Sequence, residues 1–366
     1  MTSEQAPLQV HVGPPTPGGR EVRLVNRRPL QAMRLAEGRS ATEALRLLPL
    51  VFGVCAHAHR AAAADALGHA LGADAPARDT LHRQARLESL REHLLHIHRD
   101  WPLALDLAPA DDEPAQALRL VQSAGHSAGL RALLDWITRH TLGMPPRRWL
   151  EMDHVDDLRR WALRFDGAAP RLLRDLLERT PTPCLAPLDA LEDLPPDVPG
   201  ARLAAPDAMD FAHRPQLAGA CLETGPAARR RRHALLGACA GHGLLGRFAA
   251  RLLDVAHTAL ELQRDEVVAP RAEAPGLGWV DCARGRLLHH AETDAQGRVL
   301  RYRIVAPTEW NTHPRGLCAR LLGRIGAGAS PAVHIEARMV MLAVDPCVAA
   351  SVHLEHAGAA LEPGHA

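Results

Sequence analysis

The sequence predicts a mainly α-helical protein with a small β portion, an α+β fold. Apolar residues make up 47% of the 366-residue chain but aromatic residues only 3%, so we expect a core of Leu, Ala and Val, which favours helices over sheet. The apolar spacing also changes along the chain, from three- and four-residue steps to strand-like runs in the last third. The expected parts are an N-terminal arm with a short strand (1–34) and one domain (35–366), which contains a helical region (40–262), a β-rich region (267–310) and a C-terminal cysteine motif (344–353).

The N-terminal part shows little periodicity. Residues 1–20 carry Pro and Gly without a regular apolar pattern and are expected to form a loose arm, which leads into a short strand at residues 21–25. Ser40 and Glu43 have the spacing of a helix capping box. We expect them to open a short helix, and an alanine-rich helix should follow over residues 56–70.

The helical region contains several amphipathic stretches. Leu87, Leu90, Leu94 and Ile97 recur at three- and four-residue steps, which predicts a long helix over residues 80–100. Other segments are predicted from the same kind of pattern: helices at 114–142 (broken near two glycines), 155–177 and 234–262, a linker-like excursion at 180–207, and strands at 285–292 and 299–305 joined by a turn at 294–297.

Charge, histidine and cysteine content narrow the classes of function. The net charge of +1 argues against nucleic acid or a membrane surface as a general partner, and the arginine run at 229–232 is interpreted as part of a helix start. His93, His96 and His98 are interpreted as core or surface residues rather than metal ligands. The seven cysteines are odd in number and lack paired spacing, which predicts no disulfide framework. With no secretion signal and no apolar run of about 18 residues, we expect a soluble protein of the reducing cytoplasm.

The most informative stretch surrounds Cys55. Gly53 and Val54 precede this cysteine and the alanine-rich helix follows it. The thiol is therefore expected at a helix N-terminus, where free N–H groups and the helix dipole favour a thiolate. His59 should lie on the same face of the helix one turn later, within reach to donate a hydrogen bond to the sulfur. Taken alone, this pattern fits an inert core cysteine better than a ligand.

A second stretch, residues 344–353, has a similar design. It places Cys347 in a turn, followed by a helix-compatible run and by His353. Together the two stretches resemble the cysteine motifs of nickel–iron hydrogenase large subunits, which read Arg-x-Cys-Gly-x-Cys-Pro-x-x-His and Asp-Pro-Cys-x-x-Cys-x-x-His. Each motif has lost one cysteine here, because Phe52 and Ala350 stand in the positions of the missing thiolates.

Three shorter stretches occur in the same order as in that family. Asp-Cys-Ala-Arg-Gly at 281–285 resembles the Glu-x-x-Arg-Gly loop, whose arginine (here Arg284) lies over the metal site. Pro-Thr-Glu-Trp-Asn at 307–311 resembles the family's Pro-Thr-Thr-Trp-Asn segment, and residues 38–44 resemble the approach to the first cysteine motif. The resemblance extends from about residue 35 to residue 353, and it implies a shortened hydrogenase large-subunit-like fold.

The departures from the family imply a changed role. A nickel centre of this kind needs four thiolates, so the loss of two implies that no nickel is bound. The chain resembles the large-subunit-like accessory proteins of hydrogenase maturation, the HupK and HoxV type. This implies a catalytically inactive scaffold or transfer protein for iron that carries cyanide and carbon monoxide. Cys55 and Cys347 would be the metal ligands, with His59, Arg284 and His353 around them.

Several alternatives stay open from the sequence. Cys282 is a possible additional ligand, although a passive replacement of alanine explains it more simply. In the family the position of Cys347 holds nickel only, so the second iron ligand is either Cys347 or Cys282. The implied partners are hydrogenase maturation proteins and the immature large subunit. A metal-free interaction protein or chaperone that binds these partners by mimicry is the alternative function. The tail 354–366 is expected to stay attached.

Overall fold

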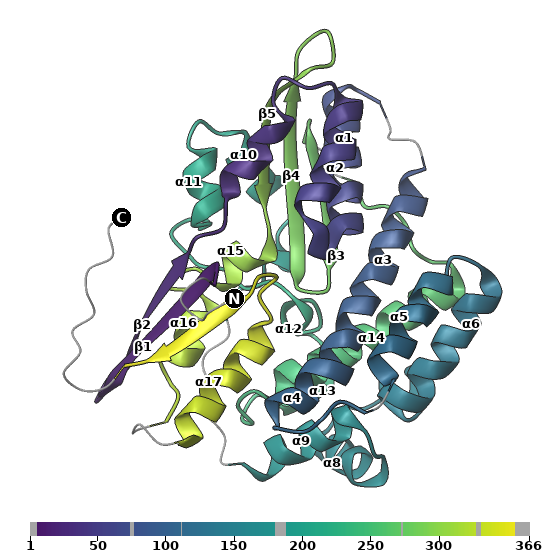
Figure 1. Ribbon diagram of the computed structural model, residues 1–366, viewed down its shortest axis with the longest axis vertical. Coiled ribbons are helices and arrows are strands. Elements are labelled where there is room, and N and C mark those ends of the chain that lie inside the picture. The colour runs from purple at the N-terminus through teal and green to yellow at the C-terminus, as the bar shows by residue number, and fades with distance from the viewer. Residues whose placement is uncertain are drawn as a thin grey trace.

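The computed structural model describes residues 6–73, 77–110, 112–179, 188–271, 274–326 and 331–355. Helices dominate it, and the strands form two small three-stranded sheets (Figure 1). One sheet lies beside helices α1 (Ala41–Val51) and α2 (Ala56–Ala70) at the top of the view, and the other lies at the lower left, near α16 (Leu317–Leu322) and α17 (Pro331–Val344). The predicted mainly α fold with a small β portion is confirmed.

The sheet near α16 and α17 joins the two ends of the described chain. Its order is β2-β1-β6: β1 (Leu8–Thr16) pairs antiparallel with β2 (Gly19–Asn26) and parallel with β6 (Ala350–Leu354). Leu8, Val10 and Val12 of β1 are fully buried at alternating positions, as in a strand with one face on the core. The loose arm expected for residues 1–20 is therefore wrong over residues 8–16. The expectation of a helix-compatible run after Cys347 is also wrong, because these residues form strand β6. The tail 356–366 lies outside the described residues.

The sheet beside α1 and α2 carries the predicted hairpin. Its order is β3-β4-β5, all antiparallel, with β3 (Leu277–Cys282), β4 (Gly285–Thr293) and β5 (Val299–Val305). Strands β4 and β5 match the prediction, and β3 was missed. Helix α2 packs directly on β3 because Gly278 has no side chain: a Cβ there would lie 2.1 Å from the carbonyl oxygen of Ala62. The predicted capping box is present at the start of α1, where Ser40 Oγ accepts from the N–H of Glu43 at 3.3 Å.

Most of the remaining helices form the lower body of the molecule, and a few pack beside the sheet β3-β4-β5 (Figure 1). The predicted long helix is α3 (Arg78–Leu95), which a π-helical turn (His96–Asp100) extends. The other helices, in chain order, are α4 (Trp101–Ala104), α5 (Glu113–Ser123), α6 (Ser127–Trp136) with a π-helical turn (Ile137–Leu142), α7 (Pro146–Trp149), α8 (Val155–Arg164), α9 (Ala168–Glu178), α10 (Asp197–Ala204), α11 (Ala208–His213), α12 (Pro226–Arg229), α13 (Ala234–Ala238), α14 (Leu245–Arg264) and α15 (Pro307–Asn311); 3-10 turns cover Leu30–Ala36, Gly53–Cys55 and Leu191–Asp193.

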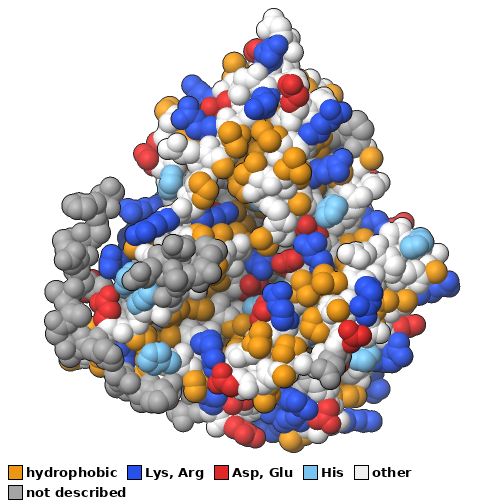
Figure 2. Space-filling model, viewed as in Figure 1, with side chains coloured by type: hydrophobic (Ala, Val, Ile, Leu, Met, Phe, Trp, Pro, Cys, Tyr) orange, Lys and Arg blue, Asp and Glu red, His pale blue; other side chains and the backbone are white. Residues whose placement is uncertain are grey.

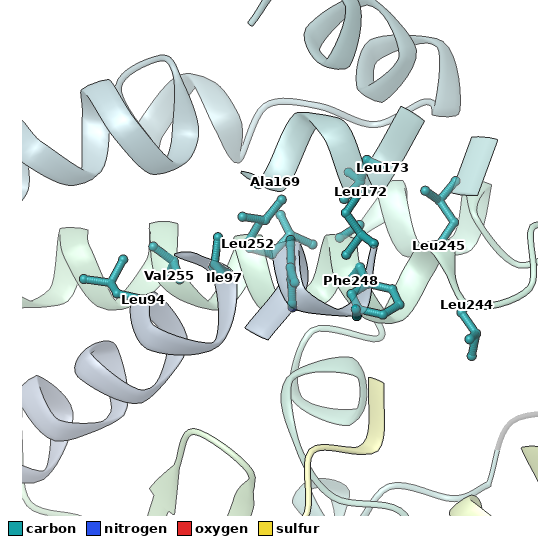
Figure 3. Close-up of a cluster of buried hydrophobic side chains, with 14 of the residues drawn as sticks. Leu94, Ile97, Ala169, Leu172, Leu173, Leu244, Leu245, Phe248, Leu252 and Val255 are labelled. Carbon is teal, nitrogen blue, oxygen red and sulfur yellow. The ribbon is translucent and has the colours of Figure 1, made fainter. Parts of the chain in front are cut away.

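Two hydrophobic cores lie side by side in the fold. The larger one packs α3, α9 and α14 together, and Figure 3 shows Leu94, Leu172 and Phe248 among its side chains. The smaller one lies between α2 and the sheet β3-β4-β5, and it includes Cys55 and Cys282. The turn between β3 and β4 links this region to α3 and to the segment after α17, as the contacts of Arg284 below show.

Buried charges are paired, and exposed charges are mixed. His93, His96 and His98 are buried, and a ring nitrogen of each lies within 3.1 Å of a carboxylate oxygen, so their interpretation as non-ligand core residues fits. The side chain of Arg229 in the arginine run is only 7% exposed and donates to Asp254 at 2.7 Å. On the face shown in Figure 2, basic and acidic side chains are interspersed.

Candidate functional site

Cys55 and Cys347 line one cavity, although they lie at opposite ends of the sequence. The cavity has a volume of about 210 Å³, whereas one water molecule needs only about 10 to 15 Å³ of such space. Its walls come from the residue before β1, the segment after β2, the end of α1 with the turn before α2, α2 itself and the segment after α17. The lining residues are Pro7, Arg28, Pro29, Ala32, Val51, Phe52, Gly53, Val54, Cys55, His59, Cys347 and Val348. The wall is thus largely apolar, with two thiols, one histidine and one guanidinium.

The Cys55 thiol is buried and pairs with a second thiol. It is the N-cap residue of α2, as predicted, and its side chain interacts with that of Cys282. This interaction and burial raise the pKa of Cys55 well above its usual value, and the same interaction lowers the pKa of Cys282. The thiolate expected at the helix N-terminus is therefore wrong: with its pKa raised, the Cys55 thiol stays protonated.

The helix N-terminus does not serve the sulfur because a carboxylate occupies it. Glu88 of α3 accepts from the backbone N–H groups of His57 and Ala58, at 3.1 and 2.9 Å. These are among the first free N–H groups of α2, the ones that would otherwise stabilise a nearby anion. Glu88 therefore occupies the N–H groups that were expected to favour a Cys55 thiolate. These groups no longer lower the pKa of the Cys55 thiol.

His59 contacts residues other than Cys55. Its Nδ1 lies 2.9 Å from Nε2 of His289, whose Nδ1 lies 2.7 Å from the hydroxyl of Tyr302. The ring stacks on Phe52 with centroids 4.4 Å apart, so the residue that replaces one missing thiolate packs against the histidine. Burial lowers the pKa of His59 to about 3 and keeps it neutral. The structure has these contacts in place of the predicted hydrogen bond to the Cys55 sulfur.

Cys347 is held by the segment that contains Thr308. The Thr308 hydroxyl lies 2.9 Å from the Cys347 sulfur and accepts from the backbone N–H of Cys347 at 3.1 Å. Burial raises the pKa of this thiol, while the charges of Arg28 and Arg284 act in the opposite direction. Both cavity thiols are therefore neutral, and metal binding would displace their protons.

Arg284 is held by two carboxylates and a backbone oxygen. Its Nε donates to the backbone oxygen of Asp345 at 3.1 Å and its Nη1 donates to Glu92 at 3.0 Å, while Nη2 lies 3.3 Å from a carboxylate oxygen of Asp345. The arginine does not line the cavity. Its charge nevertheless lowers the pKa of Cys55 and Cys347.

His353 and Cys282 lie away from the cavity wall. His353 belongs to β6, where its Nε2 lies 3.0 Å from the Ser351 hydroxyl and its ring stacks on His11 with centroids 5.0 Å apart. Cys282 interacts with Cys55 and donates to the backbone oxygen of Gly285 at 3.1 Å. In the described ranges, no cluster of three or more His, Cys, Asp or Glu residues could hold a metal ion.

The sequence located some of these residues and missed others. Cys55, Cys347 and Arg284 were found because they lie in recognisable motifs. Arg28, Glu88 and the role of Thr308 were missed. Thr308 lies in the Pro-Thr-Glu-Trp-Asn segment, so that motif could have pointed to it, whereas no local pattern marks the other two. No single helix in the described residues is long and apolar enough to cross a membrane, and α1 with α2 passes that test only as a pair bent by 103°.

Solved structures share the fold. The NAD+-reducing [NiFe]-hydrogenase in its H2-reduced state matches with a TM-score of 0.52 and 18% identity, over 90% of this chain and 93% of that chain. A variant of the [NiFeSe] hydrogenase from Desulfovibrio vulgaris Hildenborough matches with a TM-score of 0.53 and 18% identity, over the same shares. The fold is therefore that of nickel–iron hydrogenase large subunits.

Sequence relatives define the family more closely. The family described as nickel-dependent hydrogenase matches residues 224–353. The hydrogenase expression/formation protein HoxV of Cupriavidus necator is 32% identical, over 89% of this chain and 91% of the relative. The protein HupK of Azotobacter vinelandii, of the same description, is 34% identical, over 90% and 93%. This chain belongs to the family of HoxV and HupK hydrogenase expression/formation proteins.

Proposed function

We propose that this chain is a hydrogenase maturation protein without catalytic activity, and that it acts as a scaffold or transfer protein for iron carrying cyanide and carbon monoxide. One observation carries the proposal: Cys55 and Cys347 line the same cavity in a fold shared with hydrogenase large subunits. The names of its relatives agree with a maturation role. The partners would be the immature large subunit and other maturation proteins.

The donor set of the cavity fits an iron cargo. Soft thiolates are suitable ligands for iron, and an iron that already carries diatomic ligands needs few protein donors. The charges of Arg28 and Arg284 favour the thiolate form of Cys347, and Arg284 does the same at Cys55. The cargo would therefore replace two thiol protons and gain two sulfur ligands. Nickel held as in the enzyme lacks its ligands, because Phe52 and Ala350 replace two of the four thiolates.

Cys282 supports Cys55 in this proposal rather than binding iron itself. Its side chain interacts with that of Cys55 and its S–H donates to the backbone oxygen of Gly285, and it does not line the cavity. Cys347 does line the cavity, so we assign it as the second ligand. This choice addresses the alternative that the sequence left open between Cys347 and Cys282.

An infrared spectrum and an iron assay of anaerobically purified protein test the function. We expect bands of metal-bound cyanide and carbon monoxide in the wild type. Cys55→Ser and Cys347→Ser should each abolish the bands and the maturation of the partner hydrogenase, whereas Cys282→Ala should keep part of the iron. Cys239→Ser is the matched control, since Cys239 is also buried but lies outside the site. Each change should cost only about 1 to 2 kcal/mol of stability.

A metal-free interaction protein is the outcome that would replace this proposal. If Cys55→Ser restores normal hydrogenase activity to a strain without the native protein, the thiol is not needed and the scaffold mechanism is wrong. Absence of iron and of both sets of bands from the wild type would lead to the same conclusion. The chain would then act by binding its partners through mimicry of the large subunit.

A further inference from the structure

Arg28 is the one guanidinium among the described residues that line the cavity. It comes shortly after β2, in the N-terminal part of the chain, and only 10% of its side chain is exposed. Its Nη1 donates to a carboxylate oxygen of Glu309 at 2.5 Å. In the part of the chain that the structure describes, its side chain has no other hydrogen-bond partner. The remaining N–H groups are therefore available to an occupant of the cavity.

Glu309 fixes the position of this guanidinium. Its side chain is 1% exposed, and its second oxygen accepts from the backbone N–H of Ala306 at 3.2 Å, at the start of α15. A carboxylate buried this deeply is strongly destabilising without a cation, so Arg28 and Glu309 belong together. Glu309 is also the position where residues 307–311 depart from the Pro-Thr-Thr-Trp-Asn pattern. The pair is thus a feature of this chain rather than of the segment it resembles.

The contrast with Arg284 shows which arginine is free to bind. The Nε and Nη1 of Arg284 donate to Asp345 and Glu92, and its Nη2 lies 3.3 Å from an Asp345 carboxylate oxygen. It is also absent from the cavity wall. Among the described residues, Arg28 makes a single contact of this kind, and it lines the cavity together with the two thiols. Although burial lowers the pKa of Arg28, the charge and the hydrogen bond of Glu309 raise it, so the guanidinium stays charged on the same cavity wall as the two thiols.

We propose that Arg28 makes this cavity a binding site for the nitrogen end of a small linear anion, and that in the loaded protein this anion is a cyanide ligand of the iron. The assignment of this anion as a cyanide ligand of the iron rests on the proposed function. A guanidinium offers several N–H donors in a rigid plane and stays charged, and charge-assisted hydrogen bonds to an anion are the strong ones. The apolar remainder of the wall strengthens them by excluding water.

Thiocyanate titration of the metal-free protein, purified anaerobically and followed by infrared spectroscopy, tests the site itself. The wild type should bind the ion. The double variant Arg28→Met/Glu309→Gln leaves no buried charge unpaired and should bind about tenfold more weakly or worse. Arg28→Lys keeps the charge but loses the fork, and should fall between them. Arg159→Met/Asp156→Asn removes an exposed ion pair on α8 and should bind like the wild type.

The outcomes separate this inference from the proposed function. Equal thiocyanate binding by the wild type and the double variant, or no binding by either, overturns the Arg28 site even if the isolated protein carries iron. Binding that depends on Arg28 in a protein that is never isolated with cyanide or carbon monoxide bands keeps the site and refutes the iron cargo. In loaded protein, Arg28→Lys should shift the cyanide bands more than the carbon monoxide band. Unchanged cyanide bands would show that Arg28 does not bind a cyanide ligand.

Discussion

At the scale of single residues, the tautomer of His59 follows from the two side chains behind it. Tyr302 is fully buried, and in the described residues its hydroxyl has His289 as its hydrogen-bond partner. A buried hydroxyl that fails to donate loses a hydrogen bond, so Tyr302 donates to Nδ1 of His289. Nε2 of His289 must then carry a hydrogen and donate to Nδ1 of His59. The hydrogen of neutral His59 is left on Nε2, so this wall residue of the cavity is a donor.

Tyr302→Phe should release this arrangement. Without the hydroxyl, nothing fixes the hydrogen on Nε2 of His289, and both imidazoles should exchange between tautomers. Nitrogen NMR of imidazole-labelled protein is the measurement: one tautomer is expected for His59 and His289 in the wild type and averaged signals in the variant. His69, which contacts the backbone oxygen of Leu277 instead, is the internal control. Unchanged His59 signals in Tyr302→Phe would show that the chain of hydrogen bonds does not set the tautomer.

The limits of sequence reasoning are visible at the same scale. Cys55 and Cys347 could be singled out as candidate site residues because each lies in a motif that is recognisable without knowledge of its distant neighbours. The protonation of Cys55 was mispredicted because Glu88, about 30 residues further along the chain, takes the N–H groups of α2. Arg28 was missed for a similar reason, since its partner Glu309 is nearly 300 residues away. Local patterns identify chemically capable residues, whereas tertiary contacts decide their charge.

At the scale of elements, the contact of α2 with β3 positions the cysteine. Helix α2 carries Cys55 at its start and His59 one turn later, and Gly278 lets the helix lie directly on the strand. A Cβ at Gly278 would lie 2.1 Å from the carbonyl oxygen of Ala62 and 2.5 Å from the backbone nitrogen of Ala66. Both are backbone atoms in the middle of a helix, so only a shift of the whole helix relieves the overlap.

Gly278→Ala should therefore disturb both stability and the site. Forced displacement in a packed core typically costs about 1 to 3 kcal/mol, and the shifted α2 should carry Cys55 away from Cys347 and reduce the iron content. Thermal denaturation and iron per protein measure the two effects. Gly237→Ala is the control, because a Cβ there meets no described atom within 4 Å. A variant at Gly278 that melts and loads like Gly237→Ala would show that the α2–β3 contact is not restrictive.

Elements made by neighbouring residues were predictable, and those completed by distant ones were not. The capping box of α1, the long helix α3 and the β4–β5 hairpin depend on contacts within about 20 residues, and all were predicted. Strand β1 was missed although it alternates buried residues, because Pro and Gly near its end mask the pattern. Its neighbour β6 comes from the other end of the chain, and a run such as Ala350–Leu354 is compatible with a helix until that partner is known.

At the scale of the whole molecule, buried neutral histidines make the fold sensitive to acid. Burial lowers the pKa of His59 to about 3 and of His93 to about 4, and it lowers the pKa of His289 well below its usual value. In the unfolded chain these groups titrate near 6.5. Below that pH the unfolded state binds protons that the folded state refuses, so the free energy of unfolding falls as the pH falls. Each such histidine contributes up to about 1.4 kcal/mol per pH unit.

Urea unfolding between about pH 7.5 and pH 4.5 should show this loss, beginning near the unfolded histidine pKa of about 6.5. The slope follows the difference in bound protons, so removing one contributing histidine should flatten it. His59→Gln keeps a hydrogen-bonding group toward His289 but cannot titrate, and its stability should depend less on pH in this window. His154→Gln, which changes an exposed residue, is the matched control and should retain the wild-type slope. A wild-type stability that stays constant from neutral pH to about pH 5 would contradict the prediction, because it would mean that these histidines take up protons as readily in the folded protein as in the unfolded chain.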